Sequence, residues 1–99
     1  MARRKVIWSH RAKIKRLEIL EFFVERNKSN TYSKKLNSKI NKSIKLLVKY
    51  PEMGMMTDIE KIRGLIIDHI VLFYEFDDNN LIIQYVWDSR QNPDNLKLV

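Results

Sequence analysis

Two arginines are the residues of this 99-residue chain best suited to chemistry with an anion. Arg63 opens a run of strand-forming residues, and Arg90 follows the last such run. A guanidinium can hold a carboxylate or a phosphate through two parallel hydrogen bonds, and it stays charged at any physiological pH. A structural role explains either residue as well: Arg90 would pair with Asp88, and Arg63 would bridge to Glu75 across a sheet.

A row of lysines lies on one side of a segment that runs from about Tyr32 to Tyr50. Apolar residues recur there at helical spacing, and the opposite side carries Lys34, Lys35, Lys39, Lys42, Lys45 and Lys49. No Asp or Glu occurs between Glu25 and Glu52. Such a face binds nucleic-acid phosphates, complements an acidic protein, or simply keeps the helix solvated. The candidate nucleic-acid-binding residues are Lys35, Lys39, Lys42, Lys45 and Lys49.

Other reactive side chains are sparse. The chain has no cysteine, which excludes disulfides and thiolate metal sites. Its two histidines, His10 and His69, have no partner at metal-ligand or triad spacing. We therefore expect neither a metal nor a cofactor. Three methionines follow Pro51, where they provide adaptable packing or a docking patch: Met53, Met55 and Met56.

The net charge of +7 is distributed unevenly. Residues 1–51 contain fifteen Lys and Arg against three Glu, whereas residues 52–99 contain four against nine Asp and Glu. This asymmetry indicates a polyanionic partner, with nucleic acid the leading candidate. The sequence has no apolar run long enough for a signal peptide or a membrane span, so we expect a cytoplasmic protein without a membrane partner.

Hydrophobic periodicity predicts a single domain over residues 1–99, of the α+β class. Ser9 is expected to cap the first helix, and Pro51 to end the second. Tyr74, Tyr85 and Trp87 are expected in the core. The predicted elements form a helical hairpin packed on an antiparallel sheet, in the order β-α-α-β-β-β: a strand at 5–8, helices at 10–27 and 32–50, and strands at 62–67, 70–76 and 81–87.

Five short stretches carry a family resemblance that runs from Val6 to about Pro93. They are Val6-Ile7-Trp8-Ser9, Tyr50-Pro51-Glu52-Met53-Gly54, Ile62-Arg63, Leu72-Phe73-Tyr74-Glu75 and Trp87-Asp88-Ser89-Arg90-Gln91-Asn92-Pro93. In their order and spacing they resemble the RelE/ParE superfamily of toxins from bacterial type II toxin–antitoxin pairs. The resemblance implies a toxin that arrests growth when it is free of its partner, a small acidic antitoxin protein with which it forms a hetero-oligomer.

The resemblance implies two kinds of target, the ribosome with its mRNA or DNA gyrase. We expect ribosome-dependent mRNA cleavage, with Arg63 and Arg90 as the candidate catalytic residues that stabilise the charge on the scissile phosphate. One alternative is a ParE-type poison of DNA gyrase, which performs no hydrolysis. Another is a non-toxic member of the superfamily that acts only as an antitoxin-bound regulator.

Two positions depart from the pattern of the mRNA-cleaving members. Val71 stands where such nucleases commonly carry an arginine, and the stretch 87–90 lacks the terminal His or Tyr that they often use. The spacing between Arg63 and Tyr74 is more similar to the ParE branch. These departures keep both alternatives open.

Overall fold

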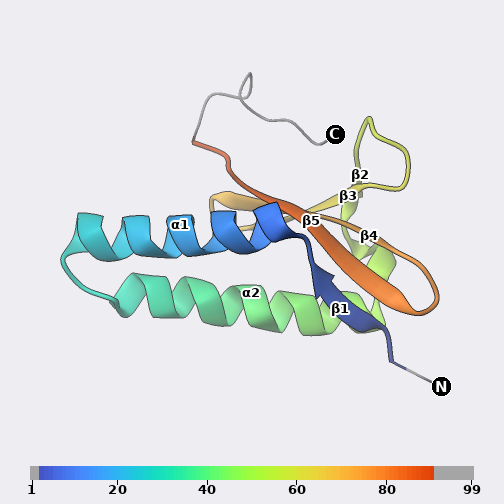
Figure 1. The fold of residues 1–99 in the computed structure, drawn as a ribbon, viewed down its shortest axis with the longest axis horizontal. Helices are drawn as coiled ribbons and strands as arrows, with labels where there is room; N and C mark the ends of the chain where they lie inside the picture. Colours follow the sequence, from blue (N-terminus) through green and yellow to red (C-terminus); the bar gives the residue numbers. More distant parts are fainter. Residues whose placement is uncertain (1–2, 91–99) are drawn as a thin grey trace.

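The computed structural model describes residues 3–90 and places two helices on one face of a five-stranded sheet (Figure 1). This arrangement confirms the predicted α+β class and the helical hairpin on a sheet. Among the described residues, neither helix is both long and apolar enough to cross a bilayer. In chain order the elements are β1 (Lys5–Trp8), α1 (His10–Asn27), α2 (Thr31–Lys49), the 3-10 turn η1 (Pro51–Met53), β2 (Met55–Met56), β3 (Arg63–Ile67), β4 (Ile70–Phe76) and β5 (Asn80–Asp88).

The sheet has the strand order β1-β5-β4-β3-β2, and it is mixed rather than purely antiparallel. β2 to β5 form an antiparallel meander, but β1 pairs parallel to β5, with Val6 opposite Leu81. The helical hairpin and three further strands separate these partners in the chain, so local patterns contain no information on their pairing. β2 is a further difference from the prediction, because no strand was predicted at residues 55 and 56, which pair with the start of β3.

The start of α1 is fixed by Ser9, as predicted. Its hydroxyl oxygen accepts a hydrogen bond from the Ala12 backbone N–H at 3.1 Å, which satisfies a helix-end donor. The same hydroxyl donates to the carbonyl of Gln84 at 2.7 Å. One side chain thus begins the helix and ties it to β5.

The core lies between the helical hairpin and the sheet. Ser33 of α2 is buried there and donates to the carbonyl of Leu20 on α1 at 2.8 Å, so this buried hydroxyl is satisfied. Tyr74 is fully buried in this core, as expected. Trp87 is also buried, but it pairs with Val71 on the other face of the sheet. Tyr85 is only half-buried, under the guanidinium of Arg11. The buried apolar residues of the core include Ala12, Ile19, Phe23, Leu36, Ile40, Leu47, Leu72, Ile83 and Val86.

The Tyr74 hydroxyl fixes the segment that joins α2 to the sheet. It donates to the carbonyl of Pro51 at 2.6 Å and accepts from the N–H of Gly54 at 2.9 Å, and both bonds are buried. A Cβ atom on Gly54 would collide with this hydroxyl, so the position requires glycine. η1 is therefore held against β4 from inside the core.

Candidate functional site

Arg63 lies at the start of β3 and binds backbone rather than an acidic side chain. Its Nη1 donates to the carbonyl of Glu52 at 3.2 Å and to that of Gly54 at 3.0 Å. The expected bridge to Glu75 is wrong, because Glu75 accepts a hydrogen bond from Gln84 at 2.6 Å instead. Arg63 and the Tyr74 hydroxyl thus hold the same linker from two sides.

Arg90 follows the end of β5 and forms the predicted ion pair with Asp88. Its Nε lies 3.0 Å from Asp88 Oδ1 and its Nη2 lies 2.8 Å from Oδ2, which is the bidentate geometry. The Arg90 backbone N–H also donates to Oδ1 at 3.0 Å. The guanidinium carbon lies 4.8 Å from the centre of the Phe23 ring, so Arg90 also contacts α1.

The electrostatics of this pair follow from its geometry. The hydrogen bond from Arg90 lowers the pKa of Asp88, against the opposing effect of burial. The same bond raises the pKa of Arg90. Both groups are therefore charged at neutral pH.

The two candidate arginines do not share a site. In the sheet register Arg63 is level with Tyr74, whereas Arg90 lies beyond the other end of β4, where Ile70 pairs with Asp88. The four residue steps from Tyr74 to Ile70 span about 14 Å at about 3.4 Å per residue, and Arg90 lies two residues beyond Asp88. Because each guanidinium is hydrogen-bonded at its own end of the sheet, the two groups do not converge on one phosphate-sized site.

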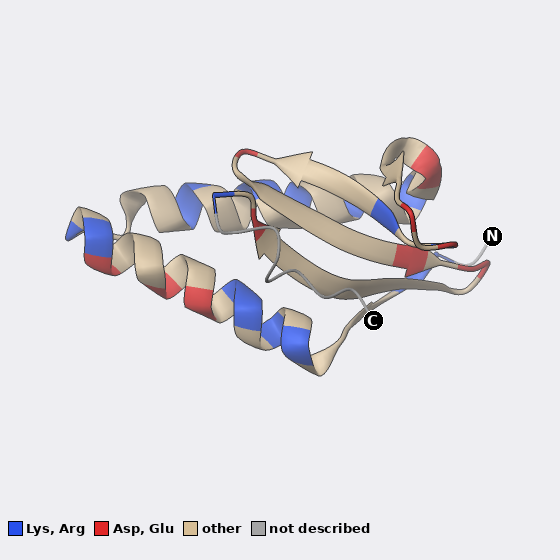
Figure 2. Cartoon of the chain, turned by 90° about the horizontal axis from the view of Figure 1, so that it is seen from above, with Lys and Arg blue, Asp and Glu red and all other residues tan. Residues whose placement is uncertain are grey.

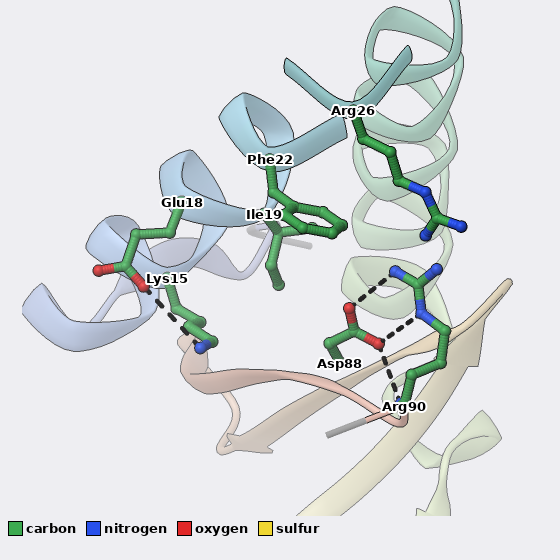
Figure 3. A pocket seen from close by; sticks show the side chains of 7 residues that line it. All are labelled: Lys15, Glu18, Ile19, Phe22, Arg26, Asp88 and Arg90. Atoms are coloured by element: carbon green, nitrogen blue, oxygen red, sulfur yellow. Dashed lines mark hydrogen bonds and ion pairs between the residues drawn. The ribbon is translucent and has the colours of Figure 1, made fainter. Parts of the chain in front are cut away.

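A pocket of about 490 Å³ opens beside Arg90, between α1 and the end of β5 (Figure 3). Ile19 and Phe22 form its apolar wall. The Nζ of Lys15 lies 3.8 Å from Glu18 at its rim. The charged residues that line it are Lys15, Glu18, Arg26, Asp88 and Arg90.

Sequence reasoning missed Arg26 as a site residue. The available indication was spacing, because residues 15, 22 and 26 share one side of a helix. That side turns toward Arg90 only through the packing of α1 on β5.

The lysine face of α2, defined as Lys35, Lys39, Lys42, Lys45 and Lys49, is exposed along its whole length. Lys and Arg recur along the helices, as the blue segments of Figure 2 show. Lys39 differs from the other four because its Nζ lies 3.0 Å from Asp68, in the turn between β3 and β4. Asp68 also accepts a hydrogen bond from the Tyr32 hydroxyl at 3.3 Å. The bond from Lys39 lowers the pKa of Asp68. Lys39 thus connects α2 to the sheet, while the remaining lysines face solvent.

The face of the sheet turned away from the helices is largely apolar. Side chains alternate along a strand, so Leu72 and Tyr74 in the core place Val71 and Phe73 on the other face. Within residues 3–90 no cluster of His, Asp and Glu could hold a metal ion, and His69 is exposed on a turn. Residues 91–93, part of the sequence resemblance, lie outside the described residues.

Comparison with known proteins agrees with this architecture. A chain of the chromosomal ParDE toxin–antitoxin system from P. aeruginosa superposes with a TM-score of 0.72 at 14% identity, covering 84% of this chain and 92% of that one. The E. coli DinJ-YafQ toxin–antitoxin complex contains a chain with a TM-score of 0.57 at 11% identity, covering 90% and 96%. At these identities the likeness is one of fold.

The sequence itself identifies the family. No curated protein sequence matches the chain. Residues 6–93, however, match the family described as the ParE toxin of the type II toxin-antitoxin system parDE. This range agrees with the span of the resemblance noted in the sequence. The chain therefore belongs to the ParE toxin family, within the RelE/ParE superfamily.

Proposed function

We propose that this protein is a growth-arresting toxin that acts by binding DNA gyrase with its DNA, and not by cleaving mRNA. The observation that carries the proposal is the separation of Arg63 and Arg90, each of which is already hydrogen-bonded within the fold. RNA cleavage requires cations and a proton-transfer group that converge on one phosphate. A poison that traps its target needs only a complementary surface.

The lysine face of α2 supports this proposal. Four exposed ammonium groups along one helix, with Lys39 beside them, suit the regularly spaced phosphates of a duplex. They supply affinity without sequence preference. In this proposal the lysine face contacts the DNA that the target holds.

The partner in the resting state is a small acidic antitoxin. The two solved structures compared above are parts of toxin–antitoxin systems. The chain also exposes large apolar side chains that a partner would cover, including Leu17 and Phe22 on α1 and Met56 on β2. An acidic protein with an apolar stripe complements both this surface and the basic helices.

Expression of the chain without its antitoxin tests the proposal. We expect growth arrest with double-strand DNA breaks and an SOS response, while transcripts stay intact. Transcript ends and chromosome integrity are measured in the same cells, with an early-stop version of the gene as control. Codon-phased cuts in mRNA without DNA breakage would contradict the proposal, and so would normal growth at high expression.

A further inference from the structure

The pocket between α1 and the end of β5 contains one cation more than its carboxylates balance. Lys15 and Arg90 are each paired, with Glu18 and Asp88 respectively. Arg26 also lines the pocket, but within residues 3–90 it forms no ion pair or hydrogen bond. The pocket therefore has a net positive charge, which is concentrated at Arg26.

The guanidinium groups of Arg26 and Arg90 extend toward each other from α1 and from the end of β5 (Figure 3). Arg90 uses Nε and Nη2 to bind Asp88, and among the described residues its Nη1 makes no hydrogen bond. Two like charges at one pocket repel each other. An anion between them would relieve this repulsion and accept charge-assisted hydrogen bonds from both.

The α1 side of the pocket is apolar next to Arg26. Phe22 leaves 50% of its surface exposed there, and Ile19 is buried. The Phe22 ring contacts that of Phe23 edge to face, with 5.3 Å between ring centres. An inorganic anion gains nothing from this apolar surface, whereas a peptide with an apolar side chain beside a carboxylate uses both the apolar surface and the arginines.

We propose that this pocket binds an acidic peptide segment. One carboxylate of the segment lies between Arg26 and Arg90, and a neighbouring leucine or aromatic side chain packs on Phe22. The identification of this peptide with a segment of the antitoxin rests on the proposed function, but the binding chemistry does not.

Titration of the ¹⁵N-labelled full-length chain tests the inference, with acetyl-Leu-Glu-amide as the probe and amide chemical shifts as the readout. We expect saturable shifts at residues 15–26 and 88–90. Acetyl-Leu-Gln-amide, which lacks the charge, should bind about tenfold more weakly. R26E should abolish binding, and R26K should retain part of it. K45E, on the lysine face, makes the same change in net charge and should leave binding unchanged.

Any of four results would overturn the inference. Equal binding of the Glu and Gln peptides, or no shifts at all, would show that the carboxylate finds no site. An equal loss in R26E and K45E would show that only net charge matters. Inorganic phosphate that binds as tightly as the peptide would show a simple anion site. Failure of the free chain to arrest growth would contradict the proposed function alone, because the titration does not depend on toxicity.

Discussion

Arg90 lies where three parts of the fold meet, since its backbone follows β5, its guanidinium holds Asp88, and its planar group stacks on Phe23 of α1. The sequence predicted the pair with Asp88 because the two residues are close in the chain. It could not predict the contact with Phe23, which depends on how α1 packs on the sheet. The carbonyl partners of Arg63 depend in the same way on the path of the linker after α2.

Asp88→Asn tests the contribution of this pair to stability. A carboxyl whose pKa is lowered on folding stabilises the fold above its unfolded pKa of about 3.9, and this contribution is lost as the pH falls through the folded pKa. We expect D88N to be less stable by about 1–3 kcal/mol at pH 7, with a difference that shrinks below about pH 4. Urea unfolding followed by tryptophan fluorescence measures it. If D88N and the unsubstituted chain had equal unfolding midpoints at pH 7, the ion pair would not stabilise the fold.

Tyr74→Phe tests the buried hydroxyl. The substitution leaves the Gly54 N–H and the Pro51 carbonyl buried without this partner, so we expect a loss of about 1–3 kcal/mol. Tyr85→Phe is the matched control. Because Tyr85 is only half-buried, we expect the loss of its hydroxyl to lower the free energy of unfolding by less. Thermal unfolding of the two variants compares them. If Y74F were as stable as Y85F, the attachment of η1 through this hydroxyl would be wrong.

At the scale of elements, the bounds of both helices and of most strands were predicted closely. Each of these bounds depends on residues that are near one another in the chain. The apolar spacing and the Ser9 cap gave the observed bounds of α1, and Pro51 ended α2 within a residue of its observed end. β2 was missed because two exposed methionines form no alternating pattern, and only the pairing with β3 makes them a strand.

The lysine face of α2 belongs to this scale, because its action requires several residues of one helix. The triple variant K42Q/K45Q/K49Q should bind duplex DNA more weakly, and its logarithmic salt dependence should be less steep by about three ion equivalents. Because the three substituted lysines are exposed, we expect the variant to unfold at the same midpoint as the unsubstituted chain. Fluorescence anisotropy at several salt concentrations measures both quantities. A control variant with equal charge loss elsewhere, K13Q/K28Q/K61Q, should keep the steeper slope; equal slopes would contradict a specific role for α2.

The whole molecule combines a helical layer rich in Lys and Arg with a sheet whose connecting turns and loops carry many of the acidic residues (Figure 2). Charge counting predicted this division, and the five stretches of family resemblance predicted the fold. The parallel pairing of β1 with β5 and the pocket between α1 and β5 were beyond prediction, since both join residues more than sixty positions apart. The proposed mode of action also belongs to this scale, because it rests on the separation of Arg63 and Arg90 across the sheet.

The most direct test of this mode of action uses purified components. The protein is incubated with DNA gyrase, ATP and supercoiled plasmid, and in parallel with mRNA-programmed ribosomes. We predict linear plasmid after detergent and protease treatment, which reports trapped covalent gyrase–DNA complexes, and full-length mRNA in the parallel reaction. Cleaved mRNA on the ribosome together with intact plasmid would contradict the account.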